Sequence, residues 1–438
     1  MALQWFLYVA AAVATINWAK SLQTDRVVCF YDSQSRYREG LGKVEAPGDI
    51  EASLTTCTHL VYGFAVIDGG NYKLVPVDEY QELDSGKGYY RAVTSLKKRY
   101  PSLNILLSVG GLADPVKDKY LTLLESEDNR KAFVSSARTL LRQYAFDGLD
   151  LAWEFPEIYV KKDRSTLGSL WHGFKKTFGL ASSHKDEKAE EHRDGFTALI
   201  RELKNSLRPD GLLLTTTILP NVDTSIYYDL KDIVPNLDFV NVLAFNYTTP
   251  ERKPDEADYP AALYQAGNRD VNHTVDGTIR WWLEKGVPAN KIILGIGALG
   301  VTWKLTSDSK ISGVPPIEAD GPGEAGPQTK TAGLLSYPEV CSLLPNPNVN
   351  SQSTSHLLRR VTDPSHKLGS YAFRLPDSSS AAGLWVAYED PDTAGYKGAY
   401  AKNKGLGGIA IWDISLDDFR GVCTGERFPI LKAARNHL

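Results

Sequence analysis

Eight short apolar runs recur along this 438-residue chain, and they limit its fold more than any other feature. Strands that alternate with helices favour a parallel sheet. Eight alternations predict an α/β fold in which the sheet closes into a TIM (β/α)8 barrel, a fold that commonly reaches this length when it carries insertions. The runs lie at 26–31, 59–65, 103–109, 146–153, 212–217, 239–244, 292–296 and 408–412, and helical patterns such as 127–144, 189–207 and 270–286 separate them.

One interval, at residues 302–384, is too long to be a simple connection between two strands. It combines Gly/Pro-rich turns with a segment at 337–344 and a strand-like segment at 369–373. We therefore expect a small α+β insertion domain at 302–384, between barrel portions at 22–301 and 385–438.

A second long interval, at residues 157–187, directly follows the fourth run and mixes basic with aromatic side chains. Loops that follow the strands form the mouth of such a barrel. Exposed aromatic and basic side chains are enriched where interfaces carry energy. We therefore expect a partner surface here, with a solvated loop and a short amphipathic helix as the alternative. Its candidate residues are Trp171, Phe174, Lys175 and Lys176.

The N-terminal residues indicate export. Residues 2–18 are almost uncharged, and Ala19 and Ser21 suit a cleavage site, so 1–21 is expected to be a signal peptide. A retained membrane anchor is the alternative. No other long apolar span follows, so we expect a secreted, extracellular protein with no membrane span in its mature form. Four cysteines in an exported chain favour two disulfides over a metal site, with three possible connectivities.

Two glycosylation sequons occur, at Asn272 and Asn246. Asn272 is expected near an accessible helix start. Asn246 lies at the end of the sixth run, where a glycan would obstruct the barrel mouth. We therefore predict that Asn272 is the modified residue.

Charge and motif content argue against two other classes of function. A net charge of −4 provides no basic field suited to nucleic acid. The segment GIGALG at 295–300 matches a dinucleotide-binding pattern, but residues 301–305 continue it as an extended segment where that motif requires a helix. The eight histidines lack the spacing of a zinc site. No cofactor or metal is expected.

The fourth run leads into DGLDLAWEFP at 147–156, which has the character of a glycosidase strand with one acid missing. Alternate residues of a strand share a face, so Asp150, Ala152 and Glu154 should project together. That face holds two carboxylates around an alanine. The alternative interpretation is that these acids only pair with neighbouring lysines or arginines.

This segment resembles the signature of glycoside hydrolase family 18, the chitinases, which carry an aspartate where this chain has Ala152. Residues 57–65, 108–111 and 407–412 resemble the second, third and eighth strands of the family. The resemblance implies a reaction in which the substrate's own 2-acetamido oxygen attacks the anomeric carbon while Glu154 protonates the leaving oxygen. Without the middle aspartate, which orients that acetamide, Glu154 lacks its partner, and it forms a vestigial motif with Asp150 and Asp147.

The same resemblance assigns a sugar-stacking role to Trp412, with Phe64 and Tyr31 as further carbohydrate-binding residues. An ordinary barrel-core aromatic is the alternative for Trp412. Other family positions have changed. Phe245 and Asn246 replace the tyrosine and aspartate that grip the acetamide, and Leu112 and Gln34 replace two tryptophans. The resemblance therefore implies that any chitinase activity is lost or weak.

Residues 29–35, 415–421 and the long 157–187 interval resemble one subgroup, the imaginal disc growth factor family of insect chitinase-like proteins. This resemblance implies disulfides between Cys29 and Cys57 and between Cys341 and Cys423. It also implies secretion and a growth-promoting role on imaginal disc cells together with insulin-like peptides, through a cell-surface receptor. Chitin or N-acetylglucosamine oligomers are possible ligands. The alternatives are a weak chitinase that uses Glu154, and a chitin-binding cuticle or wound-repair protein.

Overall fold

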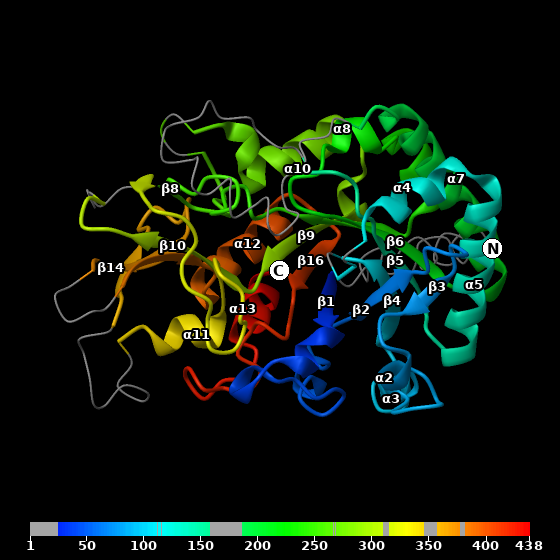
Figure 1. The fold of residues 1–438 in the computed structure, drawn as a ribbon, viewed down its shortest axis with the longest axis horizontal. Helices are drawn as coiled ribbons and strands as arrows, with labels where there is room; N and C mark the ends of the chain where they lie inside the picture. Colours follow the sequence, from blue (N-terminus) through cyan, green and yellow to red (C-terminus); the bar gives the residue numbers. More distant parts are fainter. Residues whose placement is uncertain are drawn as a thin grey trace, which may run out of the picture.

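The computed structural model describes residues 25–111, 113–114, 116–157, 186–265, 267, 269–309, 315–345, 357–376 and 382–438 (Figure 1). The expected signal peptide at 1–21 lies outside the described residues. So do the four residues of the expected partner surface, Trp171, Phe174, Lys175 and Lys176.

Eight parallel strands close into a barrel, which confirms the predicted fold class. Closure follows from the first strand, β1, which pairs with β2 on one side and with β16 on the other. A short strand, β3, extends the sheet by pairing antiparallel with the end of β2. The strands are β1 (Arg26–Asp32), β2 (His59–Ile67), β3 (Leu74–Pro76), β4 (Asn104–Gly110), β5 (Gly148–Ala152), β6 (Leu213–Ile218), β7 (Phe239–Leu243), β9 (Ile292–Gly297) and β16 (Gly408–Trp412).

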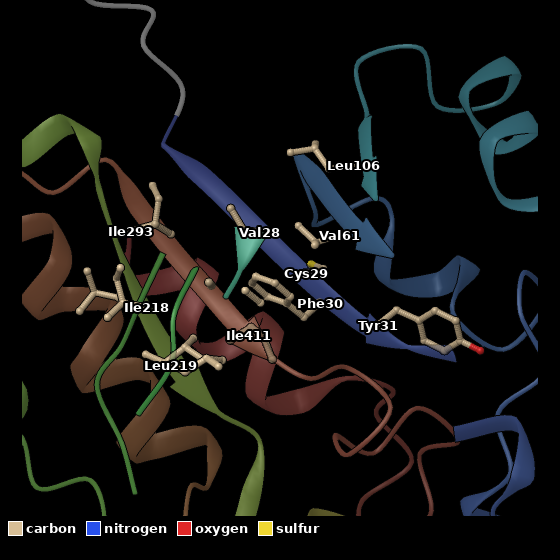
Figure 2. Packing of buried hydrophobic residues seen from close by; sticks show 14 of the residues in the cluster. Val28, Cys29, Phe30, Tyr31, Val61, Leu106, Ile218, Leu219, Ile293 and Ile411 are labelled. Atoms are coloured by element: carbon tan, nitrogen blue, oxygen red, sulfur yellow. The ribbon is translucent and has the colours of Figure 1, made fainter. Parts of the chain in front are cut away.

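The barrel strands are buried on both faces, which explains why they appear in the sequence as continuous apolar runs. Successive side chains of β1 illustrate this. Figure 2 shows the rings of Phe30 and Tyr31 pointing away from each other, and both are buried.

Helices surround the barrel, and two of them have the bounds that the sequence predicts: α5 (Glu127–Tyr144) and α7 (Ala189–Leu207). The Ser126 side chain caps α5 by accepting a hydrogen bond from the N–H of Asn129. The predicted helix at 270–286 is shorter, because a 3-10 turn at Val271–His273 precedes α10 (Val275–Glu284). The others are α2 (Glu79–Glu82), α3 (Tyr89–Thr94), α4 (Asp118–Glu125), α8 (Thr224–Tyr227), α9 (Leu230–Ile233), α12 (Pro391–Asn403) and α13 (Pro429–His437).

A five-stranded antiparallel sheet is inserted between β9 and β16, on the left of Figure 1. Its core contains Trp303 and Tyr371, which pack against Trp385 with ring centroids 5.5 and 5.2 Å away. The expected boundaries at 302 and 384 fall inside β10 and β15, so we propose that the insertion extends to the ends of these strands. Its elements are β10 (Leu299–Leu305), β12 (Leu334–Ser336), α11 (Tyr337–Ser342), β13 (Arg359–Thr362), β14 (Ser370–Arg374) and β15 (Gly383–Tyr388), and β8 (Glu256–Ala257) pairs with β11 (Ile317–Glu318).

Both disulfides form as the family resemblance implies. Cys29 in β1 bonds to Cys57, just before β2, and Cys341 in α11 bonds to Cys423. The second bond ties the insertion to the segment that leads into α13. Within the described residues, no helix is both long enough and apolar enough to cross a bilayer.

Candidate functional site

The candidate site lies where β5 ends, at the face of the barrel formed by the carboxyl ends of the strands. Trp153 packs outward against aromatic rings of α4, α5 and α7, with centroids 5.1–5.9 Å away. Because neighbouring residues of an extended segment point to opposite sides, Ala152 and Glu154 face the inside of the barrel. Asp150 lies deeper on the same side.

Asp150 is completely buried and is held by hydroxyl and amide donors from three neighbouring strands. Its carboxylate accepts hydrogen bonds from Ser108 at 2.8 Å, Thr215 at 2.6 Å and Thr217 at 2.9 Å, with Asn241 at 3.3 Å. Burial raises the pKa of Asp150, and the hydrogen bonds oppose that rise. These contacts fix its position inside the barrel.

Ala152 occupies a tight, fully buried position. Its carbonyl oxygen accepts a hydrogen bond from the N–H of Gly111 at 2.9 Å. A Cβ atom at Gly110 would lie 2.2 Å from that oxygen, so only glycine allows the two strands to approach in this way. The methyl group of Ala152 leaves Asp150 and Glu154 without a carboxyl group between them.

Glu154 follows β5, and its side chain is only 1% exposed. Its Oε2 atom lies 3.5 Å from the Nζ atom of Lys117, which comes from the loop between β4 and α4. Burial, with the negative charges of Asp114 and Glu154, raises the pKa of Tyr120 in α4. Glu154, the acid predicted from the sequence, thus lies at this face of the barrel and pairs with Lys117.

Trp412 ends β16 and is half-buried at the same face of the barrel. Its ring packs against Phe30, with centroids 4.8 Å apart, and against Phe64, with centroids 5.4 Å apart. Phe64 reaches Trp412 because the pairing of β2 with β4 shifts register between Tyr62 and Ala65, and such a bulge turns a side chain toward a new direction. Trp412 therefore lies half-buried at this face of the barrel, beside the buried ring of Phe64.

Tyr31, the third residue expected to bind carbohydrate, is turned away from Trp412. Its ring packs against Tyr62 with centroids 5.5 Å apart, and it is 1% exposed. Tyr62 in turn packs against Tyr90 of α3, outside the barrel. The expectation for Tyr31 is wrong because Phe30, its neighbour on β1, is the residue that faces inward.

Asp147 also lies away from the site, so its assignment to the vestigial motif is a further correction. It precedes β5, at the opposite end of the strand from Glu154. Its carboxylate pairs with Lys97 at 2.7 Å and accepts a hydrogen bond from the N–H of Ile105 at 2.8 Å. Asp147 therefore anchors the amino ends of β4 and β5.

Phe245 and Asn246 follow β7 and border a cavity of about 20 Å³ between the barrel and the inserted sheet. This volume suits a water molecule and is small for a sugar ring. Asn246 has a positive φ of 58°, and its Oδ1 atom is buried without a hydrogen-bond partner among the described residues. An inward amide is poorly placed to carry a glycan. Asn272, in the other sequon, is exposed in the turn before α10.

Two features of this face escaped the sequence analysis. The first is the ion pair of Lys117 with Glu154. The second is a pair of carboxylates, Asp32 at the end of β1 and Asp413 directly after β16. Burial and the negative charge of Asp413 raise the pKa of Asp32 to about 6, although Arg38 lies 3.7 Å from it. Acidic residues at the ends of two barrel strands were the available signal, since such positions face the mouth.

Comparison with known proteins identifies the family of the chain. The family model described as Glycosyl hydrolases family 18 matches residues 26–417. Chitinase-like protein EN03 of Bombyx mori is 52% identical over 98% of this chain and 99% of its own length. Chitinase-like protein Idgf4 of Drosophila melanogaster is 49% identical over 94% of both chains.

Solved structures agree with these relatives. The Ostrinia furnacalis Group II chitinase catalytic domain 2 superposes with a TM-score of 0.78 at 28% identity, over 94% of this chain and 96% of that one. Human YKL-39, described as a pseudo-chitinase with retained chitooligosaccharide binding properties, gives a TM-score of 0.75 at 27% identity, over 94% and 99% of the two chains.

The chain belongs to glycosyl hydrolase family 18. Within that family, its relatives at 43–52% identity over nearly their full length are named chitinase-like or imaginal disk growth factor proteins, apart from one named Bacteria-responsive protein 1. It is therefore a member of the insect chitinase-like group, as the motifs predicted.

Proposed function

We propose that this protein is a secreted, non-catalytic chitinase-like factor that binds N-acetylglucosamine oligomers at the barrel mouth and promotes the growth and movement of imaginal disc cells. Insulin-like peptides and a cell-surface receptor are its proposed partners. The observation that carries the non-catalytic part is Ala152, which stands where the family has an aspartate. Asp150 and Glu154 remain on either side of it.

A physical argument links Ala152 to the loss of activity. Positioning the acetamide and stabilising the charge that develops on it are the main contributions of such a site, and each correctly placed group commonly supplies a few kcal/mol. Phe245 and Asn246 have no carboxylate or phenol to compensate for the missing aspartate. Glu154 alone would provide a proton without a held nucleophile.

Sugar binding is proposed because it requires an aromatic side chain to stack on the sugar ring, whereas catalysis also requires the substrate's acetamide to be held. Trp412, half-buried beside the ring of Phe64, provides an aromatic side chain at the barrel mouth, and stacking on a pyranose needs no catalytic acid. YKL-39 provides a precedent within the same fold, since its description pairs a pseudo-chitinase with retained chitooligosaccharide binding.

A weak chitinase is the second candidate, because Glu154 and Trp412 are both present. A chitin-binding cuticle or wound-repair protein is the third, and it shares the sugar affinity without the signalling. The growth-promoting role itself is proposed from the names of the relatives.

Isothermal titration with chitotetraose, run beside a turnover assay on the same oligomer and a disc-cell proliferation assay with insulin present, separates these candidates. We expect binding by the unmodified protein and at least a tenfold weaker affinity for Trp412→Ala, about 1.4 kcal/mol. Trp281→Ala, which removes a half-buried tryptophan of α10, is the matched control. Binding without any proliferative effect would favour the cuticle protein, and proliferation without sugar binding would remove chitin oligomers from the proposal.

A further inference from the structure

Glu154, the acid retained at the barrel mouth, lies beside a basic side chain, that of Lys117. Lys117 Nζ lies 3.5 Å from Glu154 Oε2, and the two side chains differ sharply in exposure, at 51% and 1%. A half-exposed ammonium group therefore brings its charge to a buried carboxyl group. The lysine is positioned by the loop that follows β4, one strand away from Glu154.

A second carboxyl group lies near the same lysine. Burial raises the pKa of Glu157, whereas the positive charges of Lys117 and Arg252 lower it. Glu157 forms an isolated β-bridge with Val222, which holds its backbone beside the loop after β6. Lys117 therefore interacts with two carboxylates that follow β5.

The neighbouring lysine makes a different contact. Lys119 pairs with Asp114 at 2.8 Å, and the hydroxyl of Tyr120 donates to the same carboxylate. Tyr120, from α4, also has a charge interaction with Glu154. Two lysines therefore lie close together in sequence where the loop meets α4, and Lys117, at the N-cap, is the one that contacts Glu154.

We infer that Lys117 holds the Glu154 carboxyl group in its ionised form, so that this group serves the cleft as a hydrogen-bond acceptor. A general acid must carry a proton before it can give one to a leaving group. Burial alone favours the protonated form of a carboxyl group, whereas an ammonium group within about 4 Å favours the ionised form. Lys117 is a positioning residue in this account, since it acts through Glu154.

Distance and solvent screening both limit the effect of Lys117 on Glu154. The separation of 3.5 Å is longer than the roughly 2.8 Å of a strong charge-assisted hydrogen bond. Solvent also screens a half-exposed lysine. The expected influence on Glu154 is therefore at the lower end of what a neighbouring charge produces. An ionised Glu154 can accept hydrogen bonds from a sugar hydroxyl or amide group.

This inference rests on the proposed non-catalytic function and is tested by a measurement that needs no sugar. The full chain is labelled with ¹³C at glutamate carboxyl groups, and Glu154→Gln identifies the Glu154 signal by its loss. We expect Lys117→Met to raise the titration midpoint of that signal by about one pH unit. Lys119→Met, which removes the same charge two residues away in the first turn of α4, should leave the midpoint in place, and Lys117→Arg should retain it.

An unchanged midpoint in Lys117→Met, or an equal shift in Lys119→Met, would overturn the assignment. Lys117→Gln provides a second neutral variant should the first fold poorly. The outcome is independent of the proposed function, because rapid hydrolysis of chitin oligomers by the unmodified protein would contradict that function without altering the titration.

Discussion

At the scale of single residues, Ala152 separates two acids whose surroundings have little in common. Asp150 is saturated with hydroxyl and amide donors inside the barrel, whereas Glu154 is paired with a lysine at the rim. An aspartate restored at position 152 would enter a fully buried site beside Asp150. Two adjacent buried carboxylates resist joint ionisation and tend to share a proton. Restoring the missing acid is therefore only part of restoring the chemistry.

This reasoning gives a prediction for reverse substitutions. Ala152→Asp should raise chitinase activity by less than about tenfold, because Phe245 and Asn246 still provide no phenol or carboxylate to position the substrate's acetamide group. The triple variant Ala152→Asp, Phe245→Tyr and Asn246→Asp should gain at least about another tenfold, or ~1.4 kcal/mol. Turnover of a fluorogenic chitooligosaccharide measures both. Strong activity from the single change would show that the other two positions matter little.

The residue scale also shows where a sequence limits prediction. A period of two places Tyr62 and Phe64 on one face of β2, yet the register shift beside them directs Phe64 to Trp412 and leaves Tyr62 outside. No local sequence pattern signals that shift. The error at Tyr31 arose differently, because a strand buried on both faces offers no alternation that would separate Phe30 from Tyr31.

At the scale of elements, the sequence predicts the barrel strands well and the packing of the last two helices poorly. All eight apolar runs form barrel strands, and α5 and α7 have the expected bounds, because strand burial and helical periodicity are local signals. The packing of α12 on α13 was not predictable in this way. It depends on Gly398, where a Cβ atom would lie 2.2 Å from the carbonyl oxygen of Ala434 in the facing helix.

A buried acid at the start of α13 makes this element sensitive to pH. Asp417 is completely buried and accepts hydrogen bonds from the backbone N–H groups of Leu431 at 3.0 Å and Asp418 at 2.7 Å. Burial raises its pKa to about 7, although these donors lower it. The ordinary value is 3.8, so the acid form is favoured by folding. Its contribution to stability is present below pH 4 and is lost as the pH rises through 7.

We therefore predict that Asp417→Asn is more destabilising at pH 5 than at pH 8, with a difference on the order of a few kcal/mol. Urea unfolding of both proteins across this pH range measures it. A variant whose destabilisation stays constant, or grows toward pH 8, would show that Asp417 is ionised throughout.

The two disulfides provide a matched comparison of elements. Cys29 and Cys57 are 28 residues apart, and Cys341 and Cys423 are 82 apart. In the chain-entropy account, removing the first should cost about 3–4 kcal/mol and removing the second roughly 1 kcal/mol more. Cys29→Ser with Cys57→Ser, compared with the pair Cys341→Ser and Cys423→Ser, tests this by denaturant unfolding and by secreted yield. An equal or reversed order would mean that native packing, and not loop length, sets the cost.

At the scale of the whole molecule, the chain keeps the scaffold of glycosyl hydrolase family 18, with an inserted sheet and two disulfides. Our proposal places the changes that remove catalysis at the barrel mouth. A signalling partner would need a surface of its own. The 157–187 interval, which directly follows β5, stays our prediction for that surface, and its residues 158–185 lie outside the described residues.

Replacing Trp171, Phe174, Lys175 and Lys176 together by alanine should reduce growth-promoting activity while secretion and thermal stability remain near normal. Disc-cell proliferation with insulin present is the readout, and the secreted yield is the control for folding. Full activity would place the partner surface elsewhere, and poor secretion would mean that these aromatics are packed in the structure.

The most direct test of the central claim is a single-turnover experiment with chitohexaose. The purified protein is held in excess over the oligomer, so that even slow cleavage is visible by mass spectrometry, and Glu154→Gln serves as the control. We predict that chitohexaose is bound and recovered intact from both proteins. Its conversion to shorter oligomers by the unmodified protein at the rate of an ordinary family 18 chitinase, and not by Glu154→Gln, would contradict the account.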